Sequence, residues 1–200
     1  MAIKPILFNT EMVRAILDGR KTCTRRIIKA EKVDNVLNSP TRKSNPDITD
    51  AQFIKCLVDM KYEPGDILYV RETWYKSPSR YMYRANYSNT EQFYTDGKEV
   101  NIKWRPSIHM PKEAARIWLQ VTDVRVERLQ EMTGQDVLKE GLNSHVHPQA
   151  SYFDGNQREM FEKLWNSTIK KSDIDRYGWD ASPWVWVIEF ERCEKPACMR

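Results

Sequence analysis

The chain has 200 residues, enough for one domain with a substantial core or for a domain with a large insertion. Charged residues make up 30% and hydrophobic residues 40%, and no apolar run is long enough to span a membrane, so we expect no membrane partner. The net charge of +4 permits a nucleic-acid partner without requiring one. The first residues lack the apolar core of a signal peptide and the four cysteines form no Cys-x-x-Cys motif, so a cytoplasmic protein with free thiols is expected.

The first part of the chain predicts a strand, a helix and then a cationic bend. Lys4–Phe8 is typical of a short buried strand. Thr10 is a plausible cap for a helix, and Gly19 offers the left-handed conformation that ends it. After the glycine the chain interleaves four cations with two threonines, in the order Arg20, Lys21, Thr22, Cys23, Thr24, Arg25 and Arg26.

This cationic bend has two interpretations. An isolated run of Lys and Arg is most often a solvated surface that also complements the helix dipole. Against this, six cations stand against one anion between Arg20 and Lys32, a concentration that suits phosphate binding. The neighbouring arginines also disfavour the charged form of Lys21, and Thr24 is close to it in sequence; a lysine in such surroundings can act as a base.

The middle of the chain combines polar insertions with short elements. Residues 30–50 and 88–101 are polar and predict surface loops without regular structure, whereas Asp50–Met60 has the apolar spacing of a short helix. A turn at Glu63-Pro64-Gly65-Asp66 precedes a predicted strand over Ile67–Trp74, in which Glu72 and Trp74 share one face. Glu72 is equally consistent with pairing a surface cation and with lining a cleft. Tyr81–Tyr87 predicts a further strand.

The segment Lys103–Met110 carries two candidate ligand contacts. Trp104 and Arg105 precede a proline and are expected on a loop, where an indole and a guanidinium offer flat surfaces on which a base can stack. Core packing is the slightly favoured alternative for Trp104. His109 is expected to be structural, and His145 and His147 lack further ligands at suitable spacing. We therefore predict no metal and no cofactor.

The second half predicts a long bent strand followed by helices. Pro111–Ala115 begins a short helix, and alternation from Ile117 to Val126 slips at Thr122-Asp123, which indicates a bulge. A capping box at 133–136 opens a helix that ends at Lys139-Glu140-Gly141. Glu140 is electrostatically misplaced there, because the dipole favours cations at that end, and a residue that breaks a local rule is a functional candidate. Further predictions are a helix at Gln157–Asn166, a polar loop at Lys170–Asp180 and a central strand at Trp184–Arg192.

Several of these segments together resemble the ASCH domain family. They are Gly-Arg-Lys-Thr-x-Thr-x-Arg at 19–26, Glu-Pro-Gly-Asp-Ile-Leu at 63–68, Val-Arg-Glu-Thr-Trp at 70–74 and Ile-His-Met-Pro at 108–111. Among the members of the family, phage- and prophage-type proteins share segments like the last two. The resemblance runs from Lys4 to about Glu191. It implies an α+β fold around a PUA-like β-barrel, one domain over residues 1–200, and a link to RNA or a nucleotide ligand; it leaves the oligomeric state open.

Small bacterial members of this family resemble amidohydrolases that remove the acetyl group from N(4)-acetylcytidine. By motif, the resemblance implies Lys21, Thr24 and Glu140 as the catalytic residues. The expected cleft is lined by these three with Arg26 and Glu72, and the full set of expected nucleotide or phosphate contacts is Arg20, Arg25, Arg26, Glu72, Trp74, Trp104 and Arg105. This chain is nearly twice as long as those hydrolases, so a non-catalytic RNA- or nucleotide-binding module, and with less support a ribonuclease, remain alternatives.

Overall fold

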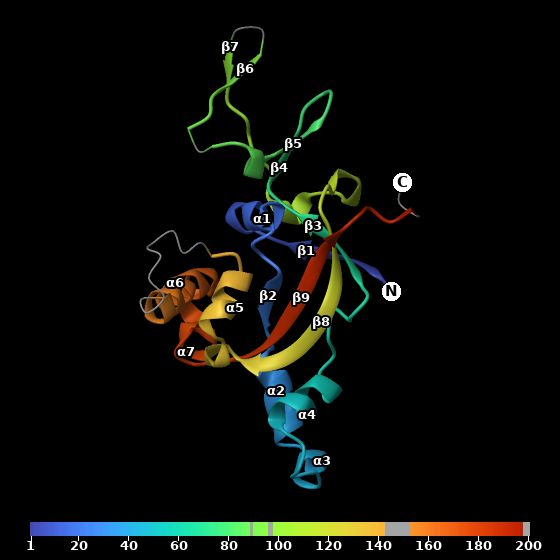
Figure 1. The fold of residues 1–200 in the computed structure, drawn as a ribbon, viewed down its shortest axis with the longest axis vertical. Coiled ribbons are helices and arrows are strands. Elements are labelled where there is room, and N and C mark those ends of the chain that lie inside the picture. The colour runs from blue at the N-terminus through green and yellow to red at the C-terminus, as the bar shows by residue number, and fades with distance from the viewer. Residues whose placement is uncertain (89, 96–97, 143–152, 198–200) are drawn as a thin grey trace.

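The computed structural model describes residues 1–88, 90–95, 98–142 and 153–197. Its centre is a five-stranded sheet in the order β1-β3-β8-β9-β2 (Figure 1). β1 runs parallel to β3, and the other neighbouring strands are antiparallel. The strands are β1 (Ile3–Leu7), β2 (Cys23–Ile27), β3 (Ile67–Arg71), β8 (Trp118–Arg128) and β9 (Trp184–Cys193). With helices packed around this sheet, the α+β class predicted from the sequence is confirmed.

The long strands β8 and β9 form a curved ribbon that sets the shape of the sheet (Figure 1). Their register shifts between Val121 and Asp123, which confirms the predicted bulge. β3 joins this ribbon near one end and β2 near the other, so the curvature brings the two outer strands towards each other. Arg26 on β2 donates a hydrogen bond to the carbonyl oxygen of Leu7 on β1 at 3.0 Å. Among the described residues no backbone ladder joins β1 to β2, so the sheet is open on this side.

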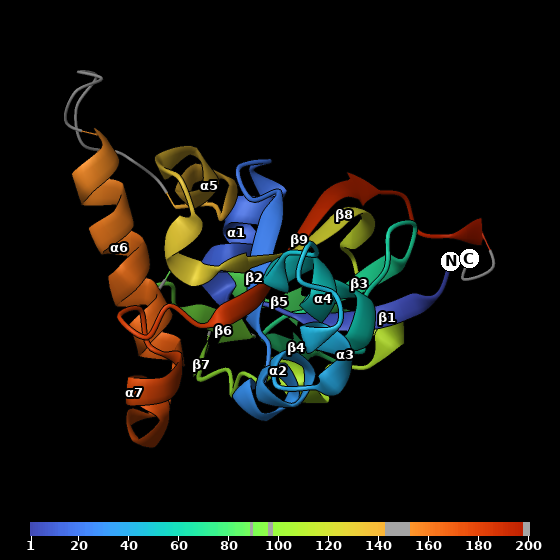
Figure 2. The same cartoon turned by 90° about the horizontal axis from the view of Figure 1, so that it is seen from below.

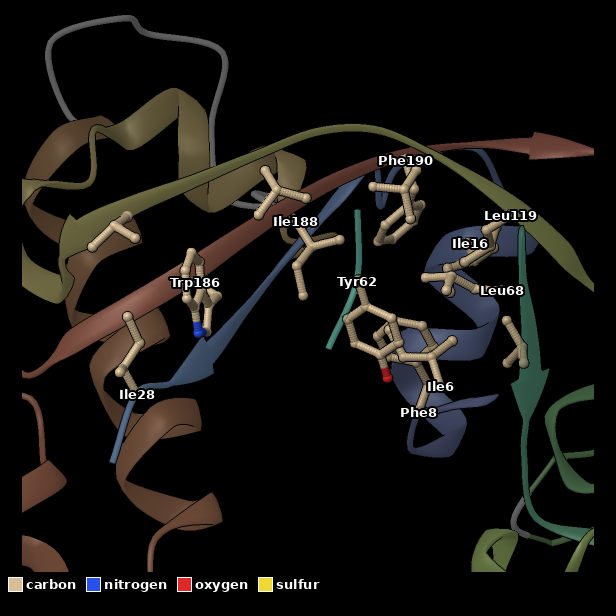
Figure 3. Packing of buried hydrophobic residues seen from close by; sticks show 14 of the residues in the cluster. Ile6, Phe8, Ile16, Ile28, Tyr62, Leu68, Leu119, Trp186, Ile188 and Phe190 are labelled. Atoms are coloured by element: carbon tan, nitrogen blue, oxygen red, sulfur yellow. The ribbon is translucent and has the colours of Figure 1, made fainter. Parts of the chain in front are cut away.

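Apolar side chains cover both faces of β9. Trp186 and Ile188 belong to the main core on the inner face, together with Phe8 and Leu119 (Figure 3). Val185 and Val187 point to the other face, into a second cluster built by α5 (Gly134–Lys139) and α6 (Phe153–Thr168). A strand buried on both faces belongs inside a sheet, so the predicted central position of this strand is confirmed.

The helix that precedes the cationic bend begins one residue earlier than predicted. α1 spans Thr10–Leu17, and its cap is Asn9, whose side chain accepts a hydrogen bond from the Met12 amide at 2.9 Å. The expected Thr10 cap is therefore wrong, because Asn9 already supplies the accepting oxygen. Gly19 has a φ of 75°, the left-handed conformation that the sequence predicts after the helix.

The prediction of an irregular loop over residues 30–50 is wrong. This segment forms α2 (Ala30–Leu37) and the short α3 (Pro40–Lys43), followed by α4 (Asp50–Leu57), a helix that the apolar spacing did predict. Val33 is buried in the core, and Val36 and Leu37 pack against it. Three apolar residues at helical spacing are enough to dock a helix, even though the composition around them is polar.

The predicted strand over Ile67–Trp74 is also interrupted. β3 ends at Arg71, because the next amide, that of Glu72, donates to the Met110 sulfur at 3.2 Å instead of continuing the ladder. The chain then forms two small sheets, one of β4 (Trp74–Lys76) with β5 (Tyr81–Tyr83), the other of β6 (Phe93–Thr95) with β7 (Lys98–Val100). The second lies in the segment 88–101, so the expectation of an irregular connection there is wrong. The predicted strand Tyr81–Tyr87 ends at Tyr83 in a 3-10 turn over Arg84–Asn86.

The remaining elements surround the sheet in two groups (Figure 2). α6 lies beside α5 at one side of the molecule, whereas α2, α3 and α4 form a separate group. A short helix, α7 (Ile174–Tyr177), occupies part of the predicted polar loop, and further 3-10 turns span Ser107–His109, Lys112–Ala114, Leu129–Glu131 and Lys171–Asp173. Within the described ranges, no helix has the length and apolarity that a membrane crossing requires.

Candidate functional site

A cavity of about 360 Å³ lies beside β2, between the end of β1, the C-terminus of α5 and the face of α6. We call it the Lys21 cavity. Its polar lining includes all three residues that the ASCH resemblance implies as catalytic. The charged and polar residues are Asn9, Lys21, Thr24, Arg25, Arg26, Glu140 and Thr168, and the apolar wall includes Phe8, Phe161, Leu164, Trp165 and Ile169.

An ion pair between Lys21 and Glu140 is buried at the edge of this cavity. Lys21 Nζ donates to Glu140 Oε2 at 2.6 Å and to the Glu140 carbonyl oxygen at 2.9 Å. Only 1% of the lysine side chain and 6% of the glutamate side chain are exposed. The backbone brings them together, because Lys21 and Glu140 form an antiparallel bridge and the Thr22 amide donates to the Lys139 carbonyl oxygen at 2.8 Å.

Arg25 is a second cation on the same carboxylate. Its guanidinium lies 3.2 Å from Glu140 Oε1 and 3.3 Å from Glu127 Oε2. Burial opposes the charge of Arg25, but these anions, Glu140 first among them, raise its pKa above the ordinary value. Two buried cations therefore explain how Glu140 is tolerated at a helix C-terminus. The positive charge of Arg25 is used inside the protein, although the sequence interpretation assigned it to a ligand.

Cys23 lies on the same face of β2 as Arg25, with its sulfur 3.8 Å from an Arg25 nitrogen. Burial, reinforced by the charge of Glu140, raises the pKa of the Cys23 thiol to about 12. A thiol in this state is protonated at neutral pH and is a poor nucleophile. The nucleophile that the cavity can offer is consequently a hydroxyl.

Thr24 is a residue of the cavity that carries a hydroxyl. It pairs with Ile188 across the β2–β9 ladder, so it belongs to the inner face of the sheet, and it lines the cavity. Within the described part of the chain its hydroxyl makes no hydrogen bond, neither to Lys21 nor to Glu140. The hydroxyl is thus available to a ligand in the cavity.

Arg26 completes the polar lining and differs from the other cations. Its guanidinium donates to the carbonyl oxygens of Leu7 and Arg25, at 3.0 and 3.4 Å, and lies 5.4 Å from the centre of the Phe8 ring. Burial lowers the pKa of Arg26, and the charge of Glu140 opposes that shift. No described carboxylate forms an ion pair with Arg26, so its charge is not neutralised within the described structure.

The other expected contacts lie elsewhere. Arg20 is at the rim of the bend, where it pairs with Asp18 at 2.8 Å and donates to the Gly141 carbonyl oxygen at 2.5 Å. Glu72 does not line the cavity, so its expected place in the cleft is wrong. Its carboxylate is buried and makes two hydrogen bonds to Arg116, at 2.8 and 2.9 Å, which matches the salt-bridge alternative.

The three remaining expected contacts, Trp74, Trp104 and Arg105, also lie outside the cavity. Trp74 is buried in a third apolar cluster, and Arg105 lies over it at 5.2 Å from the ring centre. Trp104 is half-buried and packs against the rings of Tyr87 and Phe93, outside the apolar clusters of the core. The chain leaves the main sheet after Arg71 and forms the small sheets in the upper part of Figure 1. Trp74, Trp104 and Arg105 belong to this part of the chain.

The aromatic wall was missed by the sequence analysis. The spacing of Phe161 and Trp165 predicts the apolar face of the helix at Gln157–Asn166, but nothing in it shows that this face closes a cavity with Phe8. The spacing of residues gives no sign either that Glu127, near the end of β8, binds Arg25. Within the described ranges no three His, Cys, Asp or Glu side chains gather as a metal site would require; His145 and His147 lie outside the described residues.

The fold and site define an α+β protein whose open, curved sheet carries a buried Lys–Glu pair and a threonine hydroxyl in one cavity. No family model and no curated protein matches the sequence. Among solved structures, an ASCH domain from Lactobacillus crispatus JV V101 is similar, with a TM-score of 0.39 and 10% identity, covering 96% of this chain and 79% of that one. The hypothetical protein PH0355 is also similar, with a TM-score of 0.38 and 13% identity, covering 96% of this chain and 100% of that one.

Proposed function

We propose that the Lys21 cavity binds an acetylated cytidine, free or within RNA, and removes its N(4)-acetyl group. The observation that carries the proposal is the buried Lys21–Glu140 pair, 2.6 Å apart, in the same cavity as the hydroxyl of Thr24. A nucleophile and a proton-transfer pair in one enclosed site are the parts that acyl transfer needs.

The size and lining of the cavity support a ligand with a flat ring. Its volume of about 360 Å³ falls within the usual range for small-molecule sites, and its lining includes the rings of Phe8, Phe161 and Trp165. Aromatic rings bind a nucleobase by stacking. Phe161 and Trp165 come from α6, whereas Phe8 lies beside the charged groups, with its ring centre 5.5 Å from Lys21 Nζ. Arg26 would hold the nucleoside or its phosphate, because its charge has no carboxylate partner among the described residues.

In the proposed reaction, the Thr24 oxygen forms a bond to the acetyl carbonyl carbon, and its proton passes to the Lys21–Glu140 pair. The carbon–nitrogen bond then breaks, and that proton moves to N4 of the departing cytosine. Water attacks the acetyl-threonine ester and the bond from the Thr24 oxygen to the acetyl carbon breaks; one proton of the water restores the hydroxyl, and the other leaves to solvent as acetic acid ionises to acetate. Glu140 orients Lys21 and shares its proton through the hydrogen bond, so the pair acts as one unit.

The test is deacetylation of N(4)-acetylcytidine by Thr24→Val, with Thr22→Val as the matched control. Both changes replace a hydroxyl by a methyl group near β2, but Thr22 is exposed and does not line the cavity. We expect Thr24→Val to lose at least about 100-fold in kcat while binding cytidine as the wild type does, and the control to keep its turnover. Undiminished turnover in Thr24→Val would remove this threonine from the reaction.

A non-catalytic module that binds RNA or a modified nucleoside is the second candidate. It is favoured by one observation: Lys21 Nζ makes two hydrogen bonds to Glu140, so the pair has a complete structural role without a reaction. Such a module would bind acetylcytidine saturably and leave it intact. Wild-type turnover therefore decides between the two candidates.

A further inference from the structure

A second cavity of about 460 Å³ adjoins the first at the open side of the sheet. We call it the Trp186 cavity. It lies between β2 and β1, and the segment after α4 forms part of its wall. The two cavities share three lining residues, Leu7, Arg26 and Ile27. A ligand long enough to fill both must therefore pass Arg26.

The floor of the Trp186 cavity is apolar and aromatic. Trp186 is 7% exposed and Tyr62 is 6% exposed, and the tyrosine hydroxyl is held by the Pro5 carbonyl oxygen at 2.8 Å. Figure 3 shows Trp186 and Ile28 on the β2 side and Tyr62 on the opposite side. The rings of Trp186 and Tyr62 lie at the inner face of the sheet. An indole that is fixed by packing and still lines an open cavity offers a face on which a base can stack.

The rim of this cavity is cationic. Lys29, Lys32 and Lys61 line it and are exposed, against a single acidic residue, Asp59. Within the described part of the chain, none of the three lysines forms an ion pair. Three cations against one acid, around an apolar floor, complement a ligand with an anionic backbone and flat apolar groups.

Arg26 sits where the two cavities meet, held by two backbone carbonyl oxygens and without a carboxylate among the described residues. The order along the surface is thus an aromatic cavity, a cation, and a second aromatic cavity with a cationic rim. We propose that the two cavities bind successive nucleotides of one single-stranded RNA, with the linking phosphate on Arg26. The identity of the first nucleotide rests on the proposed function; the binding of the strand does not.

The test compares two double variants with the same net charge. Lys29→Gln/Lys32→Gln removes two rim lysines, and Lys43→Gln/Lys55→Gln removes two exposed lysines that line neither cavity. The probes are uncharged N(4)-acetylcytidine and a short single-stranded RNA, titrated at several salt concentrations. Because each neutralised phosphate contributes about 0.7 to the salt slope of single-stranded binding, the rim variant should lose about 1.4 of that slope.

We expect the wild type to bind the RNA more tightly than the nucleoside, the control to keep the wild-type salt slope, and neither variant to change nucleoside binding. A rim variant with the slope of the control overturns the inference, and so does a wild type that binds RNA no better than the nucleoside. The two proposals fail separately. RNA binding that depends on the rim lysines without deacetylation refutes the hydrolase alone, whereas turnover of the nucleoside with an unaltered RNA slope refutes the two-cavity site alone.

Discussion

The Lys21–Glu140 pair makes a strong prediction about stability, because its carboxylate serves two buried cations. In Glu140→Gln the side chain keeps its shape and loses its charge, which leaves Lys21 and Arg25 without their shared counterion. Both cationic side chains are 1% exposed, so water cannot replace the lost partner. Breaking one member of a buried ion pair costs about 3–5 kcal/mol of unfolding free energy.

For a chain of this size, about 1 kcal/mol corresponds to about 2–4 °C in Tm, so Glu140→Gln should melt roughly 6–20 °C below the wild type. The matched control is Glu159→Gln. Glu159 pairs with Lys163 at the same distance of 2.6 Å, but those side chains are 59% and 74% exposed. We expect no resolvable change in Tm for the control, because water and salt screen an exposed pair.

The assay is thermal and urea unfolding followed by circular dichroism. Arg25 keeps its ion pair with Glu127, so Lys21 is the cation that Glu140→Gln leaves without a carboxylate. Adding Lys21→Met removes that cation, so the double variant should recover part of the lost stability. If Glu140→Gln melts with the control, the carboxylate is not buried between the two cations. The argument for a dry, preorganised proton-transfer pair would then be refuted.

Two further predictions concern the helix that carries Glu140. Gly141 has a φ of 90°, and an added Cβ would lie 2.8 Å from the Lys21 Cβ, whereas Gly19 has a φ of 75° with nothing within 4 Å. Gly141→Ala should therefore cost about 2–5 kcal/mol in urea unfolding and Gly19→Ala only about 1–2 kcal/mol; equal costs would contradict the packing of Gly141 on Lys21. Burial tends to raise the pKa of Asp136, but hydrogen bonds from Thr133 and the charges of two arginines outweigh it and hold that pKa below its usual value. The contribution is present above the unfolded value of about 4 and is lost as pH falls through the folded-state pKa, so the stability difference between wild type and Asp136→Asn should be constant near neutral pH and shrink as the pH falls below about 4. A difference that stays constant over this whole range would mean that the carboxylate charge does not stabilise the helix start.

Local patterns were sufficient for the elements around the site. The capping box at Thr133 and Asp136 is present, with the Asp136 amide donating to the Thr133 hydroxyl at 3.3 Å, and Gly141 ends that helix in the left-handed conformation. The bulge in β8 and the central position of β9 could also be predicted from the pattern of apolar residues. Each of these features depends on neighbours a few residues apart, so the sequence determines them directly.

The prediction was weakest where polar composition concealed a docking face or where a strand changed partners. α2 depends on three apolar residues in a polar segment, and β3 ends at Arg71 because the Glu72 amide bonds to the sulfur of Met110 from a distant loop. Neither event has a local signal. As a result, the Glu72 carboxylate binds Arg116 and does not line the expected cleft. The alternation of the predicted strand had favoured the cleft.

The cationic bend, the misplaced Glu140 and the spacing of Lys21 and Thr24 are all visible in the sequence. Their meeting is not, because Lys21 and Glu140 are 119 residues apart and only the packing of the α5 C-terminus against the bend brings them into contact. Tertiary structure also decided that Arg25 is neutralised by Glu140 and Glu127, while its neighbour Arg26 keeps an uncompensated charge between two cavities. Side chains alternate across an edge strand, so adjacent arginines of the same kind face different partners, and those partners come from the fold.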